Sequence, residues 1–113
     1  MKALIITTKG EYIEKEIEDK LETLQEIVGG LIEYVDLSED GLQMIVNEEG
    51  KIYDLEYNLG ATILFNQTHL WRDYICGDVI IVNTDENGEN ASIKELDVQT
   101  VKNMIESGIY GGA

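Results

Sequence analysis

The segment Asp78-Val-Ile-Ile-Val-Asn83 constrains the fold of this chain most strongly, because branched apolar residues occupy four successive positions. A strand with one wet face alternates apolar and polar residues, whereas a continuous apolar run is typical of a strand buried on both faces. Residues 2–7, Lys-Ala-Leu-Ile-Ile-Thr, are also rich in β-forming residues. The sequence therefore predicts two buried strands, at 2–7 and 78–83, with the first near the centre of a sheet.

Residues 11–28 have two interpretations. In the first, apolar residues at helical spacing form one long helix: Ile13, Ile17, Leu21, Leu24 and Val28. In the second, Lys9-Gly10 turns a hairpin into a strand at 11–17, and a helix begins near Asp19. Asp19 and Glu22 then form a capping box, and Gly29 supplies the left-handed residue that ends the helix. The second interpretation is favoured, because a cap has no purpose inside a continuous helix.

The middle of the chain predicts a strand at 31–36 and a hairpin of strands at 42–46 and 51–57. Its turn is Asn47-Glu48-Glu49-Gly50, with Gly50 in the left-handed conformation. Residues 60–66 are expected to form a short helix or an irregular buried segment.

The C-terminal part predicts a short strand at 91–94 and a last helix capped by Asp97. Gly108 is expected to end this helix, and residues 109–113 to fray as a tail. Its inward face is expected to hold Val98, Val101, Met104 and Ile105.

These elements predict an α+β fold. With 113 residues, the chain is expected to form one compact domain over residues 1–108. We expect a mostly antiparallel sheet of five or six strands with two helices packed on it.

The charge excludes several classes of function. The chain has 23 Asp and Glu against 8 Lys and Arg, a formal charge of -15. A free-standing nucleic-acid binder needs a basic face, and an anionic membrane surface repels such a chain. Cys76 is the one cysteine, so an internal disulfide is excluded. No long apolar run is present, and the cytoplasm is the expected location.

Acidic residues concentrate between residues 11 and 56, where 15 of them face three lysines. In a strand, Glu14, Glu16 and Glu18 would point the same way about 6.6 Å apart, close to the rise across two nucleotides. One hypothesis is therefore a surface that imitates nucleic acid and binds a basic groove, while the alternative is a solvated acidic surface. The residues of this acidic surface are Glu14, Glu16, Glu18, Asp19, Glu22 and Glu26.

A second candidate surface is aromatic. Trp71 and Tyr74 lie close to Phe65 in the sequence, with Arg72 between them. Trp and Arg are common anchors at interfaces, although such a group also forms the lid of a small core.

The sequence predicts no enzyme, metal site or cofactor. His69 and Cys76 lack a second ligand pair, so a zinc site is not expected. The Asp85–Glu89 turn lacks the ligand spacing of a calcium loop. The serines lie at predicted turns and helix ends and have no adjacent base.

Several short motifs together resemble a known family. They are Leu24–Gly30, Ile32-Glu33, Asn47–Lys51, Asn58, Ala61-Thr62 and Ile75–Val79. Over roughly residues 2–106 the chain resembles small proteins of phages and conjugative elements that are known only as a domain of unknown function. The resemblance carries no catalytic residues. It implies a mobile genetic element, where small acidic accessory proteins often target host machinery, and it favours the hairpin-plus-helix interpretation of residues 11–28.

Three hypotheses follow for function. The first is a non-enzymatic accessory protein that binds a protein partner with a basic surface, such as a host or defence factor. The second is a small regulatory module that dimerises through a sheet edge or through the aromatic cluster. The third, an enzyme or small-ligand binder, needs a pocket with convergent polar groups, for which the sequence offers no catalytic set.

Overall fold

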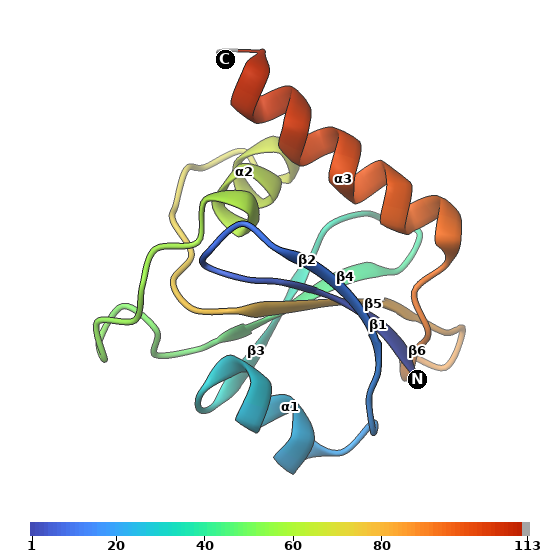
Figure 1. Cartoon of the computed structure of the whole chain (residues 1–113). Coiled ribbons are helices and arrows are strands. Elements are labelled where there is room, and N and C mark those ends of the chain that lie inside the picture. Colours follow the sequence, from blue (N-terminus) through green and yellow to red (C-terminus); the bar gives the residue numbers. More distant parts are fainter. Residues whose placement is uncertain (112–113) are drawn as a thin grey trace.

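The computed structural model describes residues 1–111 and contains one antiparallel sheet with helices on both faces (Figure 1). Five strands follow the order β2-β1-β5-β4-β3, and β6 pairs with the end of β5. Helix α1 covers one face of the sheet, and α2 and α3 cover the other. The strands are β1 (Lys2–Ile6), β2 (Tyr12–Glu16), β3 (Ile32–Asp36), β4 (Leu42–Asn47), β5 (Val79–Thr84) and β6 (Asn90–Ala91).

The two buried strands predicted from apolar runs are β1 and β5, which pair with each other inside the sheet. All four apolar residues of β5 are completely buried. Alternate side chains enter different cores: Val79 and Ile81 pack under α2 and α3, whereas Ile80 and Val82 pack under α1. This explains the continuous apolar run, because neither face of β5 reaches solvent.

The hairpin-plus-helix interpretation of residues 11–28 is confirmed: β2 pairs with β1, and α1 (Leu21–Val28) follows. Gly29 ends α1 with φ 86°, as predicted. The capping box is wrong, because the N-cap is Lys20 and no side chain caps the helix. The Asp19 carboxylate instead accepts a hydrogen bond from Asn90 Nδ2 at 2.9 Å.

The predicted hairpin of residues 42–46 and 51–57 is wrong. β4 pairs with β3 on one side and β5 on the other, so no edge remains for a strand at 51–57. Residues 51–54 form turns in which Asp54 has the left-handed φ of 56°, and Tyr57 forms an isolated bridge with Cys76. The preceding Gly50 does not have a left-handed φ. The strand predicted at 31–36 is joined to β4 by the turn of residues 37–41, where Gly41 has φ 92°.

Three helices pack on the sheet, because residues 60–66 lie in the helix α2 (Leu59–Thr68). The last helix, α3, runs from Glu95 to Tyr110 and passes through Gly108, so its predicted end is wrong. Asp97 is not its cap; the N-cap is Lys94, and Asp97 accepts from Asn83 Nδ2 at 3.1 Å. Of the predicted tail, residues 112–113 lie outside the described residues. No helix within 1–111 is long and apolar enough to cross a membrane.

Buried asparagines connect segments that are distant in the sequence. Asn58 is fully buried; its Nδ2 donates to the carbonyls of Ile6 and Gly77, and its Oδ1 accepts from Ala61 N–H at the start of α2. Asn47 Nδ2 donates to the Val28 carbonyl at the end of α1. Because an unpaired buried amide is costly, these bonds fix how the helices join the sheet.

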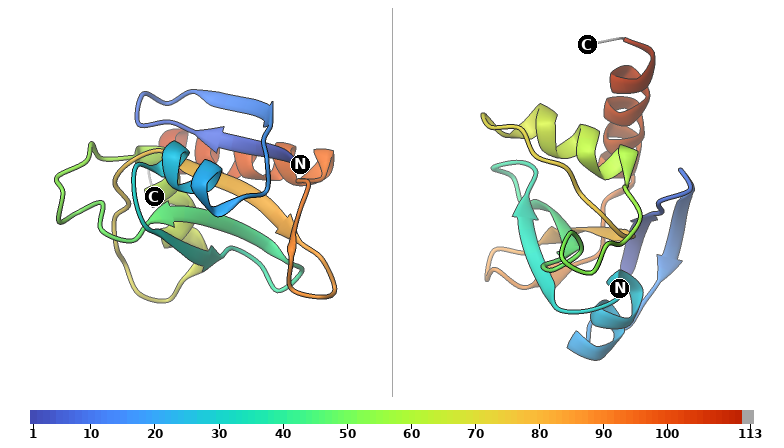
Figure 2. Two further views of the ribbon diagram at one scale, coloured as in Figure 1. Left: turned by 90° about the horizontal axis from the view of Figure 1, so that it is seen from below. Right: turned by 90° about the vertical axis from the view of Figure 1, so that its left-hand side faces the viewer.

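The two edges of the sheet are β2 and β3, and Figure 2 shows them on opposite sides of the molecule. The segments that follow β4 and α2 lie near the β3 edge, and they form the aromatic site described next.

Candidate functional site

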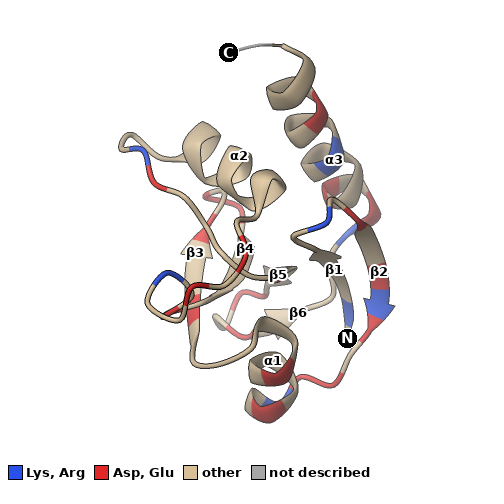
Figure 3. Ribbon diagram, turned by 60° about the vertical axis from the view of Figure 1, so that its left-hand side comes forward, with Lys and Arg blue, Asp and Glu red and all other residues tan. Residues whose placement is uncertain are grey.

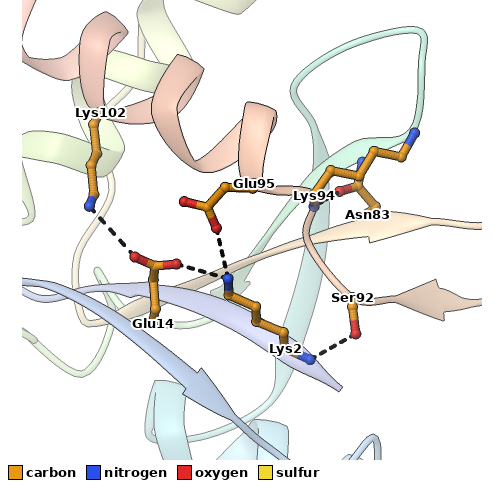
Figure 4. A network of polar contacts seen from close by, with 7 residues as sticks. All are labelled: Lys2, Glu14, Asn83, Ser92, Lys94, Glu95 and Lys102. Atoms are coloured by element: carbon orange, nitrogen blue, oxygen red, sulfur yellow. Dashed lines mark hydrogen bonds and ion pairs between the residues drawn. The ribbon is translucent and has the colours of Figure 1, made fainter.

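The predicted acidic surface begins at Glu14 on β2, where the carboxylate is paired with two lysines. Lys2 Nζ lies 3.0 Å from one Glu14 oxygen, and Lys102 Nζ of α3 lies 3.8 Å from the other (Figure 4). Lys2 also contacts Glu95 at 2.9 Å. Hydrogen bonds to Glu95 and Glu14 raise the pKa of Lys2, and the bond from Lys2 lowers the pKa of Glu95. Glu14 therefore belongs to a network that joins β1, β2 and α3.

The other predicted acidic residues are distributed around the β2 and α1 side of the molecule. Glu16, Glu18 and Glu26 line a shallow depression of about 430 Å³ together with Lys15. Glu16 lies 3.1 Å from the Met1 ammonium, and Glu18 lies 3.0 Å from Lys20 Nζ.

Glu22 and Glu26 are exposed on α1, across the sheet from α3. Figure 3 shows acidic residues on β2, β3, α1 and α3 and in the segments between elements, rather than along one stripe. The structure thus brings Glu16, Glu18 and Glu26 together, but it directs Glu14 toward a different layer.

The aromatic residues border a hollow of about 390 Å³ beside β3, which we call the Trp71 hollow. Three segments form its wall: strand β3 with the end of β4, the turn that follows β4, and the segment that leads from α2 to β5. Apolar side chains of Val35, Val46 and Ile75 lie among its lining residues. Trp71 and Tyr74 line it as well, whereas Arg72 is exposed outside the lining.

Trp71 is held by rings from α2 and from the residue that ends it. Phe65 is buried in α2 and stacks on His69 with 4.1 Å between ring centroids. The Trp71 ring meets both edge-on, 6.0 Å from Phe65 and 5.2 Å from His69. Trp71 nevertheless remains 62% exposed, so an indole face held in place is available to a partner.

A lysine of the chain itself occupies one side of the Trp71 hollow. Lys51 Nζ lies 4.3 Å from the centre of the Tyr74 ring and contacts the Asp73 carboxylate. The hydrogen bond from Lys51, together with the one from the Tyr74 backbone N–H, lowers the pKa of Asp73. The hydrogen bond to Asp73 raises the pKa of Lys51. Aromatic faces and carboxylates attract cations, and this corner of the hollow already holds one.

Carboxylates also line the hollow on the side of β3 and β4. Glu33 extends from β3, and Glu48 and Glu49 follow β4. Asn47 positions this turn, because its Oδ1 accepts from the Glu49 N–H at 2.7 Å.

Four residues of the hollow were not predicted from the sequence as site residues: Glu33, Glu48, Glu49 and Lys51. All four nevertheless lie in the motifs that carry the family resemblance, Ile32-Glu33 and Asn47–Lys51. Their presence in these motifs is the sequence signal that could have marked them as site residues.

The surroundings of His69 and Cys76 indicate structural roles: His69 contacts the end of α2, and Cys76 is buried. His69 Nδ1 lies 3.0 Å from the Phe65 carbonyl and 2.9 Å from Thr68 Oγ1. Cys76 is buried, and burial raises the pKa of its thiol, which disfavours the reactive thiolate. Within the described residues, no three His, Cys, Asp or Glu side chains come together as metal ligands.

Comparison with known proteins identifies a family. No curated protein and no solved structure matches the chain. A model of a domain of unknown function, DUF3846, matches residues 1–106, which include every strand, all residues of the Trp71 hollow and most of α3. The chain therefore belongs to the DUF3846 family.

Proposed function

We propose that this chain is a non-enzymatic binding protein that holds a basic segment of a partner protein in the Trp71 hollow. The observation that carries the proposal is the position of Lys51, whose ammonium group lies over Tyr74 and against Asp73. Trp71 lines the same hollow as Glu33, Glu48 and Glu49, and none of these three carboxylates is in an ion pair among the described residues. A partner's Lys or Arg would satisfy this ring and these carboxylates.

The chemistry of these groups favours a protein partner. An exposed Trp held by packed neighbours is a frequent centre of binding energy, and a cation over its ring adds about 0.5–2 kcal/mol. The formal charge of -15 would speed the approach of a basic surface, an effect that salt reduces. The resemblance to proteins of phages and mobile elements makes a host or defence factor in the cytoplasm a fitting partner.

Nucleic-acid mimicry by the acidic surface is the second candidate. It is favoured by the depression that Glu16, Glu18 and Glu26 share. It is less well supported, because Glu14, Glu16 and Glu18 each have a cation within 4 Å.

The test compares two sets of substitutions on one captured partner. The partner is isolated from host lysate at low salt, identified and purified, and its affinity is measured at two salt concentrations. We expect Trp71→Ala to weaken binding more than tenfold, while Tyr110→Ala, which removes an exposed ring at the far end of α3, leaves it unchanged.

Substitutions on the acidic surface provide the result that would contradict binding in the Trp71 hollow. Replacing Glu14, Glu16, Glu22 and Glu26 together by Lys removes the charges that mimicry requires. If this variant loses binding while Trp71→Ala retains it, the Trp71 hollow is not the binding site. Circular dichroism of every variant establishes that each is folded.

A further inference from the structure

The free edge of the sheet at β3 lies directly beside the Trp71 hollow. β3 is the last strand in the order and pairs only with β4 among the described residues. The bonds Leu37 N–H to Leu42 carbonyl and Glu48 N–H to Leu31 carbonyl set the pattern of this pairing. Because hydrogen-bonded pairs alternate along antiparallel strands, Glu33 and Val35 direct their N–H and C=O groups toward β4.

The backbone groups of the intervening residues therefore point away from the sheet. Ile32, Tyr34 and Asp36 direct N–H and C=O outward, where no described strand lies. Such a row of unpaired groups is a template for another strand.

Side chains of β3 alternate between the two faces of the sheet. Glu33 and Val35 line the Trp71 hollow. Ile32 packs toward α1, and the Tyr34 hydroxyl accepts from Asn90 Nδ2 on the same side as Asp19. A strand added beside β3 would place every second side chain over the hollow.

We propose that the partner's basic segment binds as an additional antiparallel strand on β3, with its basic side chains directed into the Trp71 hollow. This inference rests on the proposed function and specifies the binding mode. An antiparallel orientation continues the pairing of every strand pair in the sheet.

The charges near the β3 edge favour a basic segment over a second copy of the chain. Glu33 and Asp36 lie on β3 itself, Glu48 and Glu49 line the adjoining hollow, and Lys51 is already paired with Asp73. A second copy of the chain would bring its own carboxylates against these, and like charges directly opposite one another destabilise a strand pair. A basic segment meets opposite charge instead.

The register of the added strand follows from the same alternation. Its residues opposite Glu33 and Val35 project into the hollow, about 5 Å from those side chains and about 6.6 Å from each other along the strand. The residue opposite Tyr34 exchanges both backbone hydrogen bonds with it. In a peptide of alternating Arg and Val, the Arg side chains therefore enter the hollow, and the Val N–H groups donate to β3.

The experiment uses that peptide in three forms, titrated into the full chain and followed by NMR. One form is unmodified, one is N-methylated at every Val and one at every Arg, so the two modified forms have the same composition. We expect methylation at Val to weaken binding more than about tenfold, because it removes the donors that face β3. Methylation at Arg is expected to leave the affinity within about twofold. A peptide of alternating Glu and Val controls for charge and is not expected to bind.

Amide hydrogen exchange gives an independent result on the protein. Bound peptide should slow exchange at Ile32, Tyr34 and Asp36, whereas the amides of Glu33 and Val35 are already bonded to β4 and should change little.

Equal effects of the two methylations, or the reverse order, would overturn antiparallel strand addition. If the unmodified peptide still binds and loses affinity with Trp71→Ala, the proposed function stands without it. Failure of the unmodified peptide to bind would overturn both.

Discussion

At the scale of single residues, Gly50 is required for space rather than for a left-handed backbone. A Cβ added there would lie 2.8 Å from the Cys76 carbonyl oxygen, which belongs to the segment leading into β5. We expect Gly50→Val to lower the free energy of unfolding by more than about 1 kcal/mol. The stability of Gly50→Ala should lie between those of the wild type and Gly50→Val. Urea denaturation measures the series. Equal stability of all three proteins would contradict the close approach.

Asp73 provides a prediction about pH. Its pKa is lowered in the folded state by Lys51, so its contribution to stability is present above the unfolded pKa of about 3.9 and is lost as pH falls through the lower folded pKa. We expect Asp73→Asn to destabilise the protein by at most about 1 kcal/mol at neutral pH, since the pair is partly exposed.

This difference should shrink in acid, because the wild-type carboxyl then also becomes neutral. Chemical denaturation of both proteins at neutral pH and below about pH 4 checks the prediction. A difference that stays constant over this range would mean that the ion pair contributes nothing.

At the scale of elements, the sequence predicts best where periodicity alone decides the structure. The apolar run of β5 is an example. Residues 11–28 are not, because their apolar spacing also fits one long helix, and the turn at Lys9-Gly10 is the signal that agrees with the observed β1–β2 hairpin. The predicted hairpin of residues 42–46 and 51–57 is wrong because residues 42–46 can pair with a segment on either side in the sequence. The structure uses both β3 and β5 as neighbours of β4, and β5 lies more than 30 residues away. Local turn residues do not indicate which of the candidate segments pairs with β4.

The residues of the proposed binding site show the same limit. Trp71 and Tyr74 could be recognised individually, because exposed aromatics close together in a short segment suggest an interface. Glu33 and Glu48 could not be placed beside them, since that proximity depends on how β3 and β4 pair and on where the chain returns from α2. The ion pairs of the predicted acidic surface could not be foreseen for a related reason, because the partners of Glu14 are Lys2 and Lys102, which are distant in the sequence.

The contact between α2 and α3 determines whether Gly108→Ala raises or lowers the stability of the protein. Replacing Gly by Ala inside an exposed helix stabilises it by about 1 kcal/mol. At Gly108, however, a Cβ would lie 2.4 Å from Ile63 Cγ2 of α2. We therefore expect Gly108→Ala to destabilise the protein by about 1–3 kcal/mol.

A double-mutant cycle identifies the cause. Ile63→Ala makes room for the added methyl group. Gly108→Ala should therefore destabilise the Ile63→Ala protein less than it destabilises the wild type. A stabilised Gly108→Ala variant would show that the two helices do not approach this closely.

At the scale of the whole molecule, excess negative charge opposes folding. The chain has 23 acidic against 8 basic residues, and like charges repel one another in the compact state. We expect the melting temperature to rise when sodium chloride is added from a low concentration to about 0.15 M, because the screening length falls to about 8 Å.

A variant with Glu22→Lys and Glu26→Lys carries less of that excess and should show a smaller rise. Neither residue has a cationic partner within 4 Å among the ion pairs of the described residues. A melting temperature that falls with salt would mean that the ion pairs outweigh the general repulsion.

The central position of β5 has a consequence for synthesis. The β1–β2 and β3–β4 hairpins are each made of neighbouring segments, but only β5 joins them into one sheet. While the chain emerges from the ribosome, the segments of both hairpins are synthesised before residues 79–84, so the apolar edges that β5 later covers are without their partner. Closing the long connection to β1 is the entropically slow step. During that interval the nascent chain is exposed to aggregation, and a chaperone would protect it there.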